Sequence, residues 1–146
     1  DVSALGGVHT LCLSGCKGVV NVSALGGVHT LDMTGCGYVG VNWCEGVVDV
    51  SALAGVHTLN LTGCECVVDV SALGGVHTLN LSGCRGVVDV SALGGVHTLT
   101  LAYCGVVDVS ALGGVHTLDL TNCGVVDVSA LVFIHWIWLG VQVWWM

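Results

Sequence analysis

The sequence predicts a β-rich repeat solenoid: a right-handed stack of about seven short coils, with one parallel β-sheet and turns or 3₁₀ segments opposite it. The first observation is that DVSALGGVHTLCLSGCKGVV, at the start of the chain, returns almost unchanged along most of its length. The second is the short period, since units begin at residues 1, 21, 49, 69, 89, 108 and 127. A short fixed period predicts coils that bury their apolar faces against neighbouring coils.

The strand of each coil is predicted at the two alternating leucines. In the first unit the segment from Thr10 to Leu13 has apolar residues two positions apart, which is the period of a half-buried strand. We therefore expect Leu11 and Leu13 to point inward, and Thr10, Cys12 and Ser14 to point outward.

The opposite side of each coil is predicted to be a tight turn or 3₁₀ segment. Val22, Leu25 and Val28 are three residues apart, and the stretch is too short for an α-helix. The glycine pair at residues 26–27 provides the bend.

The second unit is 28 residues long because it contains eight extra residues, GYVGVNWC, at about positions 37–44. These residues repeat the spacing of the strand and corner that precede them. We expect a bulge or loop that carries Tyr38 and Trp43.

The composition excludes some classes of partner. Hydrophobic residues make up 54% of the chain, and its net charge of −8 includes only two basic residues, Lys17 and Arg85. A chain without a basic patch is a poor ligand for nucleic acid, so no nucleic-acid partner is expected. The nine cysteines are odd in number, and six of them recur at one repeat position. This pattern favours reduced thiols and a cytoplasmic location.

The unit resembles the leucine-rich repeat, in particular the internalin-like form L-x-x-L-x-L-x-x-N-x-I-x-D-I-x-x-L. The segment LDLTNCGVVDV at residues 118–128 follows this pattern, with cysteine at the corner position where asparagine is usual. The coil lacks one L-x-x-L triplet, so its convex side should be thin. The resemblance covers residues 1–131 and implies a non-catalytic scaffold that binds a protein or another ligand.

Stacked coils place equivalent residues about 4.8 Å apart, so each repeated residue type becomes a column. The cysteine column is predicted to be an inward row of packed thiols, because a reduced cysteine behaves as a small buried hydrophobe. Cys12, Cys44 and Cys66 fall outside it and are expected to be the more reactive thiols. The column consists of Cys16, Cys36, Cys64, Cys84, Cys104 and Cys123.

A histidine column is expected to pack at the solvent edge beside the strands. A metal array is the alternative, but zinc needs converging ligands and a straight ladder presents parallel ones. The column consists of His9, His29, His57, His77, His97 and His116.

An acidic column precedes the 3₁₀ segments. One carboxylate per coil offers too few oxygens for calcium. The resemblance instead implies that each side chain accepts backbone N–H bonds at the turn. The column consists of Asp1, Asn21, Asp49, Asp69, Asp89, Asp108 and Asp127.

The outward face of the sheet is the predicted partner-binding surface, because its middle column varies while the flanking columns hardly change. A merely solvated face and an ice-binding array of threonines are the alternatives, and Asp32 and Asp119 interrupt such an array. No catalytic, cofactor or metal site is expected, since identical copies leave no special catalytic copy. The predicted binding residues are Thr30, Asp32, Thr58, Asn60, Thr78, Asn80, Thr98, Thr100, Thr117 and Asp119.

The last segment, residues 132–146, is an aberrant hydrophobic tail, VFIHWIWLGVQVWWM. The uncharged stretch at residues 128–146 could span a membrane by length, but it has no flanking Lys or Arg, and a membrane anchor is kept only as an alternative. Its codons can be written so that a frame two nucleotides later reads VHTLDLAWCAGVVD, a repeat unit. We therefore interpret the tail as a repeat read out of frame. We expect it to dock as a strand on the edge at residues 118–120 and to favour self-association.

Overall fold

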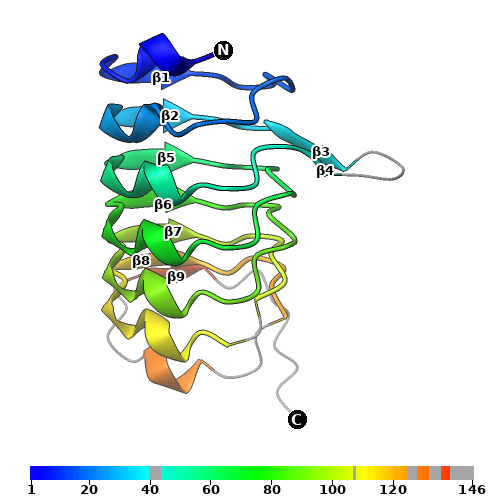
Figure 1. Cartoon of the computed structure of the whole chain (residues 1–146). Helices are drawn as coiled ribbons and strands as arrows, with labels where there is room; N and C mark the ends of the chain where they lie inside the picture. Colours follow the sequence, from blue (N-terminus) through cyan, green and yellow to red (C-terminus); the bar gives the residue numbers. More distant parts are fainter. Residues whose placement is uncertain (40–43, 107, 125–127, 132–135, 139–146) are drawn as a thin grey trace.

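The computed structural model describes residues 1–39, 44–106, 108–124, 128–131 and 136–138, and it shows a solenoid of stacked coils (Figure 1). Each coil contributes one three-residue strand to a parallel sheet of seven strands, in the order β1-β2-β5-β6-β7-β8-β9. The strands are β1 (Thr10–Cys12), β2 (Thr30–Asp32), β5 (Thr58–Asn60), β6 (Thr78–Asn80), β7 (Thr98–Thr100), β8 (Thr117–Asp119) and β9 (Trp136–Trp138). The predicted fold class is confirmed.

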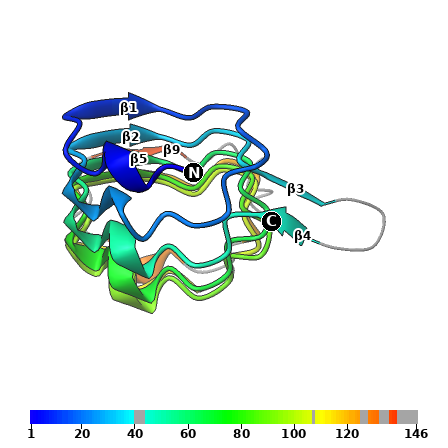
Figure 2. The ribbon, with the colours of Figure 1, turned by 45° about the horizontal axis from the view of Figure 1, so that its top comes forward.

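A 3₁₀ helix lies on the side of each coil opposite its strand (Figure 2). In the second coil the N–H of Leu25 donates to the carbonyl of Val22 at 2.9 Å, and the N–H of Val28 donates to that of Leu25 at 3.0 Å. The three-residue spacing of these apolar residues therefore does predict 3₁₀ turns. The helices are η1 (Ser3–Leu5), η2 (Leu25–Gly27), η3 (Ser51–Gly55), η4 (Ser71–Gly75), η5 (Ser91–Gly95), η6 (Ser110–Gly114) and η7 (Ser129–Leu131).

The register of the sheet places each residue on its own copy in the next coil. Leu59 pairs with Leu79, and Leu79 pairs with Leu99. The backbone bonds continue on both flanks of the strand: the N–H of Thr58 donates to the carbonyl of His29 at 3.0 Å, and the N–H of Leu61 donates to that of Asn80 at 2.8 Å. Equivalent side chains therefore form continuous columns along the solenoid.

The core lies between the sheet and the 3₁₀ helices. In the third coil Leu53, Leu59 and Leu61 have at most 1% of their surface exposed. Full burial of such a side chain stabilises the fold by about 1.5–3 kcal/mol relative to an exposed one. The alternation of inward leucines and outward polar residues predicted from the sequence is thus present in the strands.

The extra residues of the second unit form an antiparallel hairpin of β3 (Gly37–Val39) and β4 (Cys44–Gly46), which projects from the side of the solenoid (Figure 1). The N–H of Val47 donates to the carbonyl of Cys36 at 3.2 Å, so the coil closes at the base of the hairpin. The sequence predicted a bulge or loop here. Trp43 and the side chain of Tyr38 lie outside the described residues.

The described part of the tail is β9, which pairs in parallel with β8 at the edge of the sheet. Thr117 pairs with Trp136 and Asp119 pairs with Trp138, as expected of a strand that completes an open ladder. Sequence analysis missed one signal: IHWIWL at residues 134–139 repeats the spacing of VHTLDL at residues 115–120. The rest of residues 132–146, and with it the predicted self-association, lies outside the described residues. The out-of-frame origin stays a prediction that the nucleotide sequence tests.

Within the part of the chain that the structure describes, no helix is both long and apolar enough to cross a bilayer.

The 3₁₀ helices of adjacent coils approach closely through their glycines. A Cβ atom on Gly95 would lie 2.9 Å from the carbonyl oxygen of Gly74 in the preceding coil. At the same repeat position, a Cβ on Gly75 would lie 3.9 Å from the carbonyl oxygen of Ala54. Ala54 occupies a position that is glycine in the other described coils, and the local spacing is wider there.

This pair of glycines tests the packing. We expect Gly95→Ala to lower the free energy of unfolding by about 1–3 kcal/mol, because the new methyl group overlaps the neighbouring backbone. Gly75→Ala is the matched control and should change it by less than about 0.5 kcal/mol, because the space is already open. Urea denaturation of both variants measures the difference, and equal effects would contradict the close approach.

Candidate partner-binding face and residue ladders

The first polar row of the sheet face is formed by threonines at the start of each strand. These side chains are half-buried from the second coil onward. Their hydroxyl oxygens lie 3.2–3.3 Å from the Nδ1 atom of the preceding histidine in the coils that contain His9, His29, His57, His97 and His116. In these five coils the threonine hydroxyl is therefore held in place by the neighbouring ring.

The middle row is tied to the backbone, which sequence analysis missed. The Oδ1 atom of Asn60 accepts bonds from the N–H of Thr62 at 3.0 Å and from its hydroxyl at 2.7 Å. Asp32, Asn80 and Asp119 make the same pair of bonds. The signal was present in the sequence as an Asp or Asn followed two residues later by Ser or Thr.

The second polar atom of these side chains does not take part in the turn, and in Asp32 this atom, Oδ2, accepts a bond from the thiol of Cys12 at 3.8 Å. Oδ1 serves the turn, whereas the Nδ2 atoms of Asn60 and Asn80 have no hydrogen bond to the described residues. The hydroxyl and then the N–H of Thr34 hold the pKa of Asp32 below its usual value. The residue two positions after Thr100 is Ala102, which has no hydroxyl group, so Thr100 lacks this arrangement.

The acidic column lies at the entry to the 3₁₀ helices, as the family resemblance implied. The Oδ1 atom of each residue accepts a 2.9 Å bond from the N–H of the serine two positions later, for example Asp69 from Ser71. These bonds hold the pKa of Asp69 and Asp89 below its usual value. The same bond is made at Asp1, Asn21, Asp49, Asp89 and Asp108. Asp127 lies outside the described residues.

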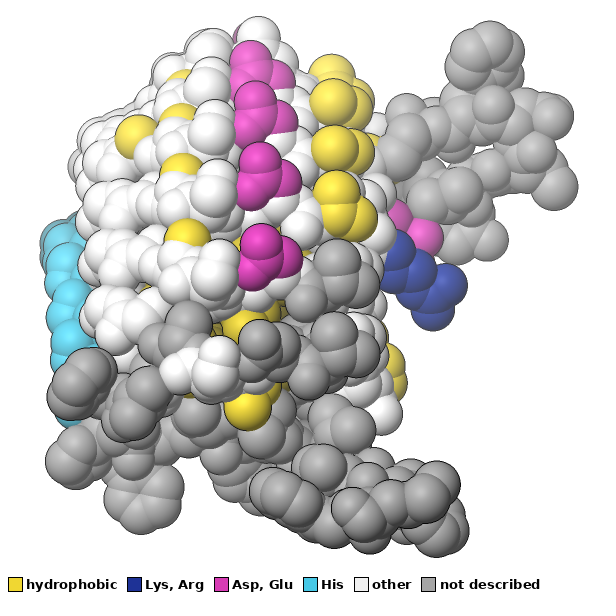
Figure 3. Space-filling view, turned by 90° about the horizontal axis from the view of Figure 1, so that it is seen from below, with side chains coloured by type: hydrophobic (Ala, Val, Ile, Leu, Met, Phe, Trp, Pro, Cys, Tyr) yellow, Lys and Arg dark blue, Asp and Glu magenta, His cyan; other side chains and the backbone are white. Residues whose placement is uncertain are grey.

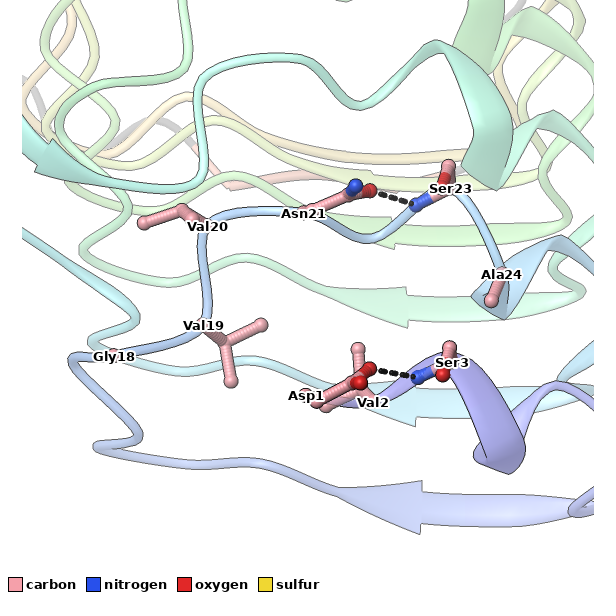
Figure 4. Close-up of a pocket in the computed structure, with 9 residues that line it drawn as sticks. All are labelled: Asp1, Val2, Ser3, Gly18, Val19, Val20, Asn21, Ser23 and Ala24. Atoms are coloured by element: carbon pink, nitrogen blue, oxygen red, sulfur yellow. Dashed lines mark hydrogen bonds between the residues drawn. The ribbon is translucent and has the colours of Figure 1, made fainter.

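Figure 4 shows this arrangement in the first two coils, where Asp1 and Asn21 line a shallow pocket together with Val19 and Val20. Similar hollows recur between later coils, such as the one between Asp49 and Asp69. Beside the acidic column runs an exposed row of valines (Figure 3). Sequence analysis assigned no role to this row, which consists of Val20, Val48, Val68 and Val88, each 54–60% exposed.

The cysteine column lies inside the solenoid from the second coil onward. The thiol of Cys84 donates to the carbonyl of Leu61 in the preceding coil at 3.1 Å. The same contact, at 2.8–3.1 Å, is made by Cys36, Cys64, Cys104 and Cys123.

Two cysteines differ from the expectation. Cys16 was predicted to point inward but is exposed. Cys66 was predicted to be a reactive thiol, but it is buried and disulfide-bonded. Cys12 is an exposed thiol, as expected. The side chain of Cys44 is outside the described residues.

Burial keeps the column thiols protonated. It raises the pKa of the Cys64 thiol to about 11 and that of Cys104 to about 12, and it raises the pKa of Cys84 further. Because the thiolate is the reactive form, these residues are poor nucleophiles and poor metal ligands.

Alkylation and substitution test the column. At about pH 8, Cys12 and Cys16 should react with iodoacetamide well before Cys84, because the reagent reaches the two exposed thiols, whereas Cys84 is buried and its pKa is raised. Cys84→Ala should lower the free energy of unfolding by about 1–2 kcal/mol through lost packing and a lost hydrogen bond. Cys16→Ala, at the same repeat position, is the control and should be nearly neutral. Equal labelling of all three residues in the folded protein would refute the inward placement.

The histidine column forms a continuous stack of exposed rings. Successive ring centroids from His9 to His116 are 4.6–4.7 Å apart, and the rings are inclined by 10–22°. Desolvation and the neighbouring rings lower the pKa of His57 and His97. No group of three or more His, Cys, Asp or Glu with metal-binding geometry occurs among the described residues.

The direction of these shifts predicts how stability depends on pH. A histidine whose pKa is lowered in the folded state binds protons more readily in the unfolded state. Its contribution to stability is therefore complete above the unfolded-state pKa of about 6.5 and declines as the pH falls below that value. The carboxylates of the acidic column have lowered pKa values, so their contribution declines only nearer pH 4. The two effects occupy separate pH ranges.

We therefore expect the free energy of unfolding to decrease as the pH is lowered from about 7.5 to about 5.5. In a His57→Gln/His97→Gln variant it should decrease less steeply. Urea denaturation at several pH values measures both slopes. Parallel slopes for the two proteins would show that the ladder does not set the pH dependence.

The comparisons with known proteins agree with this architecture. No protein-family model and no curated protein matches the chain. Among solved structures, an internalin (inlF) from Listeria monocytogenes aligns with 92% of this chain at a TM-score of 0.53 and 19% identity. The chain has the leucine-rich-repeat fold. It spans about half of that internalin structure, 48% of its length.

Two further internalins of Listeria monocytogenes are similar at lower scores. The functional domain of InlJ, described as including a cysteine ladder, aligns at a TM-score of 0.43 and 15% identity over 84% of this chain and 32% of its own. Internalin C2 aligns at 0.41 and 18% identity over 92% of this chain and 82% of its own.

Proposed function

We propose that this leucine-rich-repeat solenoid is a non-catalytic scaffold that binds a protein partner through the polar face of its sheet. The observation that carries the proposal is the middle row, in which Cys12, Asp32, Asn60 and Asn80 vary on an otherwise repeated frame. A row that varies between coils gives a surface that a single partner can distinguish along its length.

The hydrogen bonds of the middle row support this function. Because Oδ1 of Asn60 is fixed by Thr62, the outward amide has little rotamer freedom to lose when a partner binds. The strands beneath it are anchored by the buried leucines of the core. Such a surface is rigid before binding, which favours specific recognition.

An ice-binding array of threonines is the alternative that the sequence left open. The hydroxyl of Thr58 is bonded to His57, and that of Thr62 is bonded to Asn60. Side chains engaged in this way favour the protein-binding proposal, and a thermal-hysteresis assay separates the two.

The test must not disturb the turns that the middle row supports. Alanine substitutions would remove the Oδ1 acceptor, whereas exchanges of Asp and Asn keep it and change only the second polar atom, which in Asp32 accepts the weak bond from the Cys12 thiol. The variant Asp32→Asn/Asn60→Asp/Asn80→Asp/Asp119→Asn leaves the net charge unchanged. We expect it to fold normally and to lose at least about tenfold in affinity for the partner, because its outward donors and acceptors are reversed.

The control is Asn21→Asp/Asp49→Asn, which makes the same exchange in the acidic column and also preserves net charge. Proteins retained by the immobilised chain are identified by mass spectrometry and compared across the three proteins. A partner held equally by all three would place binding elsewhere.

A further inference from the structure

The histidine ladder is a surface feature that the proposed function does not use. Its rings are exposed, and each lies flat against the next at 4.6–4.7 Å. Figure 3 shows the ladder as an unbroken column along one edge, separated from the acidic column by other side chains. The ladder therefore presents one chemical group at a constant interval along a nearly straight line.

The second ring nitrogen is the atom that faces ligands. In His57 and His97, Nδ1 is bonded to the hydroxyl of the following threonine. No hydrogen bond or ion pair to Nε2 is present among the described residues for His57, His77 or His97. On protonation each of these rings becomes a cation with an N–H donor at its edge.

Few charged groups face the ladder. The 3₁₀ segments that precede it, with the sequence SALGG or SALAG, contain no charged side chain. On the strands that follow it, Asp32 and Asp119 are the carboxylates, whereas the central coils carry Asn60, Asn80 and Thr100. Protonation of the central rings is therefore not balanced by a carboxylate of the same strands.

We infer that the ladder is a binding site for a straight anionic polysaccharide, active at acidic pH. Protonated rings at this spacing repel one another, and an extended chain with one carboxylate per sugar relieves that repulsion along its whole length. An unbranched uronic acid polymer carries one carboxylate on every sugar, so an extended chain can place carboxylates beside several protonated rings at once.

The lowered pKa values of His57 and His97 agree with this behaviour, because these two rings resist protonation in the absence of a ligand. A ligand that binds only the charged form must raise those pKa values and stabilise the fold in acid. Binding and proton uptake are therefore coupled.

The experiment uses linear polygalacturonate as the probe, with the whole chain and isothermal titration calorimetry. We expect binding at about pH 5, where the uronic carboxylates remain ionised, and at least about tenfold weaker binding at about pH 7.5. Added salt should weaken it. Fully methyl-esterified polygalacturonate, which is uncharged, is the matched ligand control and should not bind.

Two variants place the binding on the ladder. His57→Gln/His77→Gln/His97→Gln should lose most of the binding at about pH 5. His57→Lys/His77→Lys/His97→Lys should keep it at both pH values, because lysine stays charged. Circular dichroism and the thermal midpoint confirm folding of each variant, and the wild-type midpoint at about pH 5 should rise with polygalacturonate.

The single change His77→Gln, at a ring without the threonine bond, serves if the triple variants do not fold, and it should weaken binding several-fold. Unchanged binding in the glutamine variants, pH-independent binding of the wild type, or equal binding of single-stranded oligothymidylate at about pH 5 would each overturn the inference. The experiment is independent of the protein-binding face, so either proposal fails alone.

Discussion

The backbone hydrogen bonds that join each coil to the next set every other feature of this structure. They begin at the histidine, where the N–H groups of His57 and Thr58 both donate to the carbonyl of His29, and they continue past the strand to Leu61. A slip of one residue would exchange the inward and outward faces and expose the leucines. Because the register is kept, each side-chain interaction of one coil is repeated in the next, and interactions that are weak singly add up along the solenoid.

This repetition acts differently inside and outside. Inside, the thiol of one coil donates to a carbonyl of the coil before it, as Cys84 does to Leu61, so a buried backbone acceptor has a hydrogen-bond partner. Outside, the same repetition brings like groups together, as in the acidic column and the stacked imidazoles. The acidic column is stabilised by donors from its own turn, whereas the imidazoles have mainly one another. The ladder is therefore the part of the surface most sensitive to solution conditions.

The inward and outward positions of most side chains could be predicted from the sequence, because equivalent residues of every repeat occupy the same place in the coil. The inward position of Leu59 and the turn bond of Asp69 follow from that place. The exposure of Cys16 could not be predicted in this way, since it occupies the same repeat position as the buried Cys36. The disulfide of Cys66 depends on an approach between side chains that periodicity does not encode. The bonds between Asn60 and Thr62 could have been predicted from their spacing of two residues, but Asn60 was expected to point wholly outward.

The hairpin has a consequence for how such a chain can change length. Ordinary coils close the corner with a bond from the N–H of Val67 to the carbonyl of Cys64, at 3.1 Å, and the second coil makes the equivalent bond between Val47 and Cys36 at 3.2 Å. The turn between these two positions can therefore be short or long without altering the path of the coil. The coils of Cys16, Cys64 and Cys84 have the same corner bond, so the solenoid can serve as a frame into which foreign peptide segments are grafted at these corners, at a spacing set by the stack itself.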